Sequence, residues 1–329
     1  MAEAIRLGLL RLCDAAPVIL AAHEEMFATQ GVRVALSVEP SWANIADKLS
    51  YGLLDGAVML PPLAMACAAG LRGRRTELIV PMNLSANGNA VTLASPLRDT
   101  FERAGVAGVV ARNRLRLAVV HGFSTHDLLL RYWLAAAGVD PDVDVEMTVV
   151  PPAEMVSSLA AGAIDGFCAG APWGQVAVHA GLGFVAVHSR DIWRDHPEKC
   201  LTLRDDLVAR DPAGVSALLR TLRTAGDLCA AADKRRALAV LLGEQQYLHL
   251  PEELIAGALN PAMGGPDFTQ QYPDATRAAW FAEQMLRWHK APPGSLEEAT
   301  RLYRADLFLA AGGTAPAALP EHFCDTQKA

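Results

Sequence analysis

The sequence lacks the features that identify membrane-spanning, disulfide-bonded and common catalytic proteins. Hydrophobic residues make up 52% of its 329 positions, yet no unbroken apolar run approaches the roughly 20 residues that span a bilayer. Its six cysteines are scattered. They form no CxxC pair and lack the regular spacing of a disulfide-bonded domain, so we expect buried thiols in a reducing compartment. Nucleophile-elbow, phosphate-loop and H-E-x-x-H motifs are absent, and the nine histidines show no metal spacing. The residues therefore favour a binding protein over an enzyme, with no cofactor.

Positive charge is also scarce. The formal charge is −7 and the isoelectric point is near 5.7, which leaves no basic field to hold a nucleic-acid backbone. The one basic cluster, from Arg72 to Arg75, is short and typical of a solvated loop. At the start of the chain, Glu3 and Arg6 stand where a secretory signal needs its apolar core. We predict a cytoplasmic protein without nucleic-acid or membrane contact, although removal of a leader would give the same start.

A unit of alternating strands and helices occurs twice. Residues 5–55 and 115–165 share the order strand, helix, strand, helix, and each ends at Asp-Gly before another apolar strand. Asp14 is the expected cap of the first helix, over residues 15–30. The match in order and spacing predicts an internal duplication. Such α/β units predict two lobes with mostly parallel sheets, whose ligands gather outside the carboxyl ends of the strands in a cleft between the lobes.

Two segments between and after the repeats are expected to cross from one lobe to the other. Ser95-Pro96 follows a polar run at 83–89 and marks the first crossing, and the loop 193–199 marks the return. The first lobe is then expected to contain residues 1–95 and 201–329, and the second lobe residues 96–200. Helical patterns after residue 201, the last over 296–309, are expected to cover the first lobe or bind a partner. The tail 310–329, rich in Ala, Gly and Pro, is expected to be loosely ordered.

The stretch His121 to Trp133 ends a strand, turns and opens a helix with polar groups at its start. Ser124 is a good N-cap, and Asp127 is placed to reach back to the N–H of the cap residue. A helix start carries unpaired N–H groups and about half a positive charge, so Thr125 and His126 stand where a small anion could be held. The alternative is an ordinary capped helix with His126 on its surface.

Polar or aromatic residues stand at similar junctions in both halves of the chain. The set consists of Trp42 after a cap, Asn89 entering a strand after a glycine, His126 opening a helix, Gly170 before Pro172, and Lys199 ending the return loop. Taken singly, each has a plain structural explanation as core filler, turn former or surface charge. Together they predict a cleft with hydrogen-bond donors and one or two positive charges, which suits a small oxyanion.

Six motifs give the chain a family resemblance over residues 5 to about 290. They are Asp14-Ala-Ala-Pro17, Ser41-Trp42, Asn87-Gly-Asn-Ala-Val-Thr92, Thr125-His126, Gly170-Ala-Pro-Trp173 and His196-Pro-Glu-Lys199. In order and spacing they resemble the nitrate- and bicarbonate-binding proteins of ABC importers, the NrtA and CmpA type. The resemblance implies a two-lobed, periplasmic-binding-protein-like fold of type II with two crossover strands. It also implies an anion pocket lined by Trp42, Asn89, His126, Gly170 and Lys199, with weaker roles for Ser41, Thr125 and Pro172.

The resemblance also bears on ligand and partner. Bicarbonate-binding relatives look to carry a carboxylate at the Lys199 position that helps hold calcium, so Lys199 implies nitrate or nitrite bound without metal. The family often has Gln where Asn89 stands and Glu where Ala171 stands, which leaves the choice between nitrate and nitrite open. Without a leader, the chain is similar to cytosolic NasS-type sensors, which work with an RNA-binding antiterminator of the NasT type. The alternatives are a periplasmic importer subunit, or an enzyme on the same fold as in pyrimidine-synthesis relatives.

Overall fold

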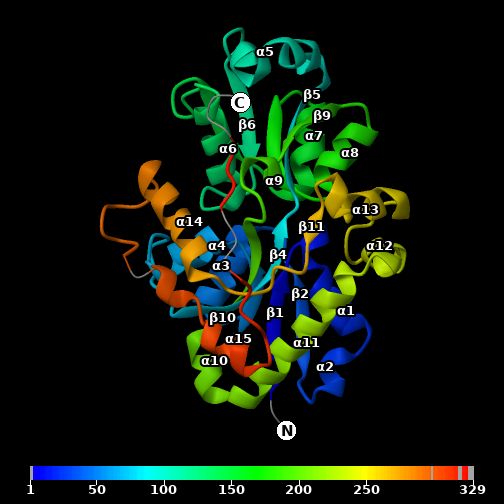
Figure 1. Ribbon diagram of the computed structural model, residues 1–329, viewed down its shortest axis with the longest axis vertical. Coiled ribbons are helices and arrows are strands. Elements are labelled where there is room, and N and C mark those ends of the chain that lie inside the picture. Colours follow the sequence, from blue (N-terminus) through cyan, green and yellow to red (C-terminus); the bar gives the residue numbers. More distant parts are fainter. Residues whose placement is uncertain (1–2, 298, 318–320, 325–329) are drawn as a thin grey trace.

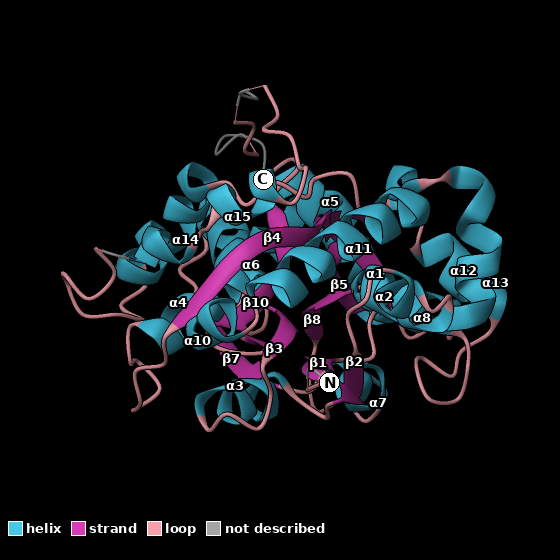
Figure 2. Cartoon of the chain, turned by 90° about the horizontal axis from the view of Figure 1, so that it is seen from below, coloured by secondary structure: helices cyan, strands magenta, loops and turns pink. Residues whose placement is uncertain are grey.

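The chain is built about two β-sheets, as the computed structural model in Figure 1 shows. Residues 3–297, 299–317 and 321–324 are described by the structure. A six-stranded sheet has the order β11-β4-β10-β3-β1-β2, and a five-stranded sheet has the order β7-β6-β8-β5-β9. We call the first sheet and the helices packed on it the first lobe, and the second sheet with its helices the second lobe. In Figure 1 the first lobe lies below the second, and Figure 2 shows helices on both sides of the strands.

The first lobe combines a parallel unit with antiparallel strands from elsewhere in the chain. Its strands are β1 (Ile5–Leu9), β2 (Val34–Val38), β3 (Gly56–Met59), β4 (Leu78–Asn87), β10 (Pro197–Arg204) and β11 (Pro266–Asp267). Its connecting helices are α1 (Ala16–His23), α2 (Met26–Thr29), α3 (Trp42–Ser50) and α4 (Pro61–Ala68). The strands β1, β2 and β3 pair in parallel, whereas β10 is antiparallel to both β3 and β4. The carboxyl ends of β1 and β3 therefore point the same way, toward the second lobe.

The second lobe repeats the parallel unit. Its strands are β5 (Asn89–Ala94), β6 (Leu115–Val119), β7 (Val145–Val149), β8 (Gly166–Gly170) and β9 (Gly183–His188). Its helices are α5 (Arg98–Val110), α6 (Thr125–Ala136), α7 (Met155–Ala160), α8 (Trp173–His179) and α9 (Ser189–Ile192). Strands β6, β7 and β8 are parallel, and β5 is antiparallel to β8 and β9.

The same ion pair occurs at the same place in both lobes. The Arg6 guanidinium and backbone N–H both donate to Asp55 at 2.9 Å. The corresponding guanidinium and backbone N–H of Arg116 donate to Asp165 at 2.8 Å. Each aspartate precedes the third strand of its unit and binds the first strand, so it fixes the register of the two. The structure therefore confirms that the two units are repeats in detail as well as in order.

The chain exchanges sheets earlier than the sequence pattern predicts. Residues 83–87 of the polar run are part of β4, and Asn83 is accommodated there because its amide nitrogen donates to the Tyr272 carbonyl at 2.8 Å. The first crossing lies at Asn87-Gly88, where φ is 58° and 88°, rather than at Ser95-Pro96. Strand β5 thus belongs to the second sheet, and β10, which begins at Pro197, already belongs to the first. The limits predicted for the first lobe, 1–95 with 201–329, and for the second lobe, 96–200, shift accordingly.

Helices after β10 cover the first lobe and also reach the second. They are α10 (Asp205–Arg210), α11 (Pro212–Ala230), α12 (Arg235–Leu242), α13 (Glu252–Ala258), α14 (Ala275–Arg287) and α15 (Ala305–Ala310). Helix α11 packs on α1, whereas α14 contacts α4 in the first lobe and α6 in the second. Within the described ranges, no helix is both long and apolar enough to cross a membrane.

Two predicted helices are broken, and part of the tail is packed. Glu25, at φ 51°, separates α1 from α2 inside the expected helix 15–30. The expected helix 296–309 is a short 3-10 turn, Ala299–Leu302, followed by α15. In the tail, Phe323 stacks on Trp193 and Trp280 at 5.3 and 5.9 Å between ring centroids. The expectation of a loose tail is therefore wrong for residues 321–324, while 318–320 and 325–329 lie outside the described residues.

Candidate functional site

A buried cluster of charged and aromatic side chains lies where the two lobes meet. The lobes touch directly there, because the Cys13 N–H donates to the Ala171 carbonyl at 3.0 Å. The first lobe contributes Asp14, Trp42, His196, Glu198 and Lys199, and the second lobe contributes Asn89, Thr125, His126 and Gly170. The eight side chains among these are all at most 4% exposed. This cluster, at the ends of strands from both sheets, is the candidate site.

Lys199 is the positive charge of the site. It lies on β10 and is fully buried, with its Nζ 2.7 Å from Asp14 Oδ2 and 2.7 Å from Glu198 Oε1. Burial acts to lower the pKa of Lys199, but the two carboxylates outweigh burial and raise it, so the ammonium keeps its charge. The Nζ also lies 5.5 Å from the centre of the Trp42 ring, within the range of a cation–π contact.

Glu198 joins the lysine to the residues of the second lobe. Its Oε2 accepts a hydrogen bond from Asn89 Nδ2 at 2.6 Å. Two imidazoles stand close but beyond hydrogen-bonding range, with His126 Nε2 3.7 Å from Oε1 and His196 Nδ1 3.6 Å from Oε2. Burial raises the pKa of Glu198, and the charge of Lys199 opposes that rise. Burial and the lysine charge therefore act in opposite directions on the pKa of this central carboxyl group.

His126 is a buried neutral donor. Burial, and then the charge of Lys199, hold its pKa well below the usual range, so the imidazole carries a single N–H near neutral pH. Ser124 caps the helix as predicted, since its Oγ accepts from the Asp127 N–H at 3.0 Å. The Asp127 carboxylate does not complete a capping box; it pairs with Lys290 at 2.8 Å and with Arg131 at 3.2 Å. Because the His126 side chain is buried, the alternative that it lies on the helix surface is excluded.

Several polar atoms of the cluster have no hydrogen-bond partner within the described part of the protein. The donors are Trp42 Nε1, Thr125 Oγ1 and the two His126 nitrogens, of which one carries hydrogen, and the acceptors are Asp14 Oδ1 and Asn89 Oδ1. Buried polar groups are normally paired, and leaving one unpaired costs about 1–3 kcal/mol. Unpaired atoms from both lobes in one cluster are what a site for a small polar ligand requires.

The structure brings the five main predicted residues together. Gly170 completes the set, because a Cβ added to it would lie 3.4 Å from Asn89 Oδ1 and 3.5 Å from Asp14 Oδ2. A side chain at this position would therefore enter the cluster. Their role in binding a ligand stays a prediction.

The three residues with weaker predicted roles are placed differently. The Ser41 hydroxyl accepts from the Asn44 N–H at 3.2 Å and so serves as the cap of α3. Thr125 is fully buried beside His126, with its hydroxyl unpaired among the described residues. Pro172 is joined to Ala171 by a cis peptide bond and precedes α8. Thr125 is therefore the best placed of the three to meet a ligand.

Asp14, His196 and Glu198 belong to the site although the sequence did not single them out. Asp14 looks like a helix cap in sequence, but it makes no cap bond and turns toward Lys199 instead. His196 and Glu198 belong to the same short motif as the lysine, and burial of the whole motif is the signal that was missing. Neither the cluster nor any other part of the described chain contains a group of three His, Cys, Asp or Glu arranged to hold a metal ion.

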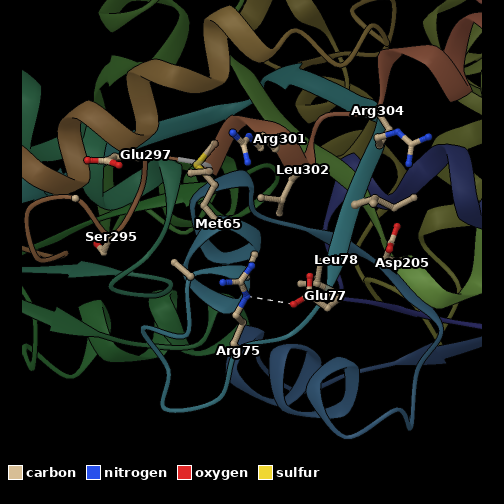
Figure 3. A pocket seen from close by; sticks show the side chains of 15 residues that line it. Met65, Arg75, Glu77, Leu78, Asp205, Ser295, Glu297, Arg301, Leu302 and Arg304 are labelled. Atoms are coloured by element: carbon tan, nitrogen blue, oxygen red, sulfur yellow. Dashed lines mark hydrogen bonds and ion pairs between the residues drawn. The ribbon is translucent and has the colours of Figure 1, made fainter.

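A cavity away from the cluster, shown in Figure 3, shares no residue with it. This cavity has a volume of about 520 Å³ and opens between the end of α4, the start of β4 and residues of the segments 294–297 and 299–304. Its walls mix arginines with carboxylates, and Arg75 and Arg304 are already paired with Glu77 at 3.1 Å and Asp306 at 2.6 Å. This mixture gives no excess of positive charge, so the buried cluster is the better candidate for an anion.

Comparison with known proteins shows the family to which the chain is related. Residues 2–243 match the model of the NMT1-like family. The chain is 36% identical to the nitrate import ATP-binding protein NrtC of Synechocystis sp. PCC 6803 and 35% identical to the bicarbonate transport ATP-binding protein CmpC of the same organism. These alignments cover 92% and 88% of this chain but 49% and 46% of those proteins, so the chain spans about half the length of the curated relatives it matches.

A solved structure matches nearly the whole chain. It is the crystal structure of the periplasmic nitrate-binding protein NrtA from Synechocystis PCC 6803, with a TM-score of 0.90 at 27% identity. The match covers 98% of this chain and 95% of that one. The predicted two-lobed, periplasmic-binding-protein-like fold of type II is therefore confirmed.

Proposed function

Because the chain belongs to the NMT1-like family and shares its fold with a nitrate-binding protein, we propose that it binds nitrate or nitrite and is not an enzyme. The observation that carries this proposal is the convergence of unpaired buried donors from both lobes beside Lys199. Nitrate is a small planar anion whose three oxygens only accept hydrogen bonds. The Trp42 N–H, the Thr125 hydroxyl, one His126 N–H and the lysine supply matching donors.

The affinity that this site supports is moderate. Hydrogen bonds to a charged ligand are the strong ones, but the ammonium of Lys199 is already shared by two carboxylates. We expect a micromolar dissociation constant, which corresponds to roughly −8 kcal/mol. Lys199 supplies a positive charge within the site itself, and this favours binding of nitrate without metal over binding of bicarbonate with calcium.

We further propose that the chain is a cytosolic sensor whose nitrate-driven closure releases an RNA-binding antiterminator. The lobes are joined around the site by a few polar contacts, among them Arg72 to His121 at 3.0 Å and Lys290 to Asp127 at 2.8 Å. A ligand that binds between the lobes stabilises this closed arrangement, and a partner that prefers an open arrangement then loses affinity. Linkage limits the effect to about 1–3 kcal/mol, or roughly 5–150-fold.

Isothermal titration tests the ligand. Nitrate and nitrite should bind, whereas chloride should not, and bicarbonate should bind more weakly than nitrate with or without calcium. If bicarbonate with calcium binds better than nitrate, the ligand proposed here is wrong.

Gel filtration tests the sensor. The chain is co-purified with the proposed partner, the RNA-binding antiterminator, and saturating nitrate should separate the two proteins. A complex that never forms, or one that nitrate leaves intact, would favour the importer alternative, in which the chain delivers the anion to a transporter.

A further inference from the structure

The orientation of the Asn89 amide does not suit an anion that only accepts hydrogen bonds. Its nitrogen is bound to Glu198 at 2.6 Å, while its oxygen has no partner among the described residues. The oxygen lies on the Gly170 side of the cluster, where an added Cβ would be 3.4 Å from it. An acceptor is therefore presented to a site whose proposed ligand also offers only acceptors.

The charges of the site raise the same difficulty. Lys199 lies within 2.7 Å of both Asp14 and Glu198, so one ammonium faces two carboxyl groups. A bound anion adds a further negative charge in a fully buried environment, where unbalanced charge is costly. Uptake of one proton by the cluster would restore the balance.

We propose that Glu198 is the positioning residue of the anion site: it takes up a proton when the anion binds, and so turns the Asn89 amide from acceptor to donor. This rests on the proposed binding of nitrate. The proton leaves a buffer acid and forms an O–H bond at Glu198 Oε2. That O–H then donates to Asn89 Oδ1 after the amide makes a half-turn, which exchanges its oxygen and nitrogen with almost no change of shape. The amide N–H₂ now faces the anion.

The surroundings of Glu198 select it over its neighbours as the proton acceptor. The groups that face it are Lys199 and Cys200 on β10, Asp14 before α1, Asn89 on β5, His126 on α6, Cys168 on β8 and His196 before β10. Burial raises the pKa of Glu198 but lowers the pKa of both imidazoles, that of His196 to about 3. Cys168 is a buried thiol whose pKa burial raises, so it already carries its proton.

The first test uses the wild-type protein with nitrate as the probe. Titration calorimetry at about pH 8, in buffers of different ionisation enthalpy, gives the number of protons taken up per nitrate. We expect a value approaching one, and a dissociation constant that rises by up to tenfold per pH unit in this range. Binding with no proton uptake overturns the inference alone, whereas no nitrate binding at any pH from about 5.5 to 9 overturns the proposed function with it.

The second test uses two matched variants. In Glu198→Gln, the new amide can donate to Asn89 Oδ1 permanently, so we expect affinity that does not change with pH and that exceeds the wild-type value at about pH 9. Asp14→Asn removes a carboxylate at the same 2.7 Å distance from Lys199 but leaves the bond from Glu198 to Asn89. Proton uptake should therefore persist, but at lower pH than in the wild type, because the Asp14 charge helps to raise the pKa of Glu198. Loss of proton uptake in Asp14→Asn, or its persistence in Glu198→Gln, contradicts the assignment to Glu198. The wild-type measurement decides the inference if either variant fails to fold.

Discussion

Replacement of Lys199 by methionine gives the sharpest test of the charge balance in the site. The change keeps most of the buried side chain but removes the ammonium that lies 2.7 Å from both Asp14 and Glu198. Removing one partner of a buried ion pair typically costs about 3–5 kcal/mol, because the remaining charge is buried without compensation. We expect a loss of this size in the free energy of unfolding at pH 7, and nitrate binding weakened by more than about tenfold.

The loss of stability in this variant should depend on pH. Burial raises the pKa of Glu198 in the folded protein, and removal of Lys199 removes the charge that opposes this rise. A carboxyl group with a raised pKa in the folded state binds its proton more tightly there than in the unfolded chain, so stability falls as pH rises through the folded pKa. The variant should therefore regain part of its stability between pH 7 and about pH 5.

Urea unfolding followed by circular dichroism measures both effects. Arg75→Met is the matched control, since Arg75 also contacts a carboxylate, Glu77, at 3.1 Å, but both side chains are exposed, at 68% and 74%. An exposed pair contributes at most about 1 kcal/mol, so this control should lose little. Equal losses in the two variants at pH 7, or a loss in Lys199→Met that does not change with pH, would refute the reasoning.

Three further substitutions test the geometry of the site and the closure of the lobes. His126→Ala should weaken nitrate binding by roughly 10–150-fold, the value of one hydrogen bond to a charged group. Because burial holds the pKa of His126 well below its usual range, the ratio of variant to wild-type affinity in calorimetry should stay constant from pH 6 to 8. Gly170→Val should abolish binding without unfolding the protein, since its side chain enters the space beside Asn89 Oδ1; calorimetry and a melting curve check both points. Lys290→Met breaks the 2.8 Å contact with Asp127 and should speed nitrate release several-fold in stopped-flow measurements, while an unchanged rate would exclude this contact from closure.

Local patterns in the sequence were sufficient to predict most of the secondary structure. Ser41 and Ser124 cap α3 and α6 as predicted, because a capping residue acts only on the backbone two or three positions away. The repeat could be predicted for the same reason, since each unit has its own order of strands and turns. A single sequence therefore predicts those helices and strands whose start and end depend on residues only a few positions apart.

Long-range contacts explain what the sequence could not reveal. Asn83 reads as part of a loop, but its amide nitrogen donates to the carbonyl of Tyr272, which is 189 positions away in the chain. Asp14 reads as a helix cap, yet it pairs with Lys199 on β10, a strand of the first lobe that comes much later in the chain. Residues at the junctions of strands and helices predicted a cleft for a small oxyanion, and family resemblance assigned the same residues to an anion pocket. The carboxylates of the cluster were missed because their partners come from distant strands.

The aromatic stack at the return crossing makes lobe motion optically observable. Trp193 lies on the segment that joins β9 to β10, with the Trp280 ring centroid 4.5 Å away and the Arg277 guanidinium 5.2 Å from the centre of its own ring. Tyr132, on α6 of the second lobe, reaches the same stack through Phe323 at 5.6 Å. Any rotation of one lobe against the other alters the distances between these chromophores. Intrinsic tryptophan emission should thus follow opening and closing in real time, without an attached label.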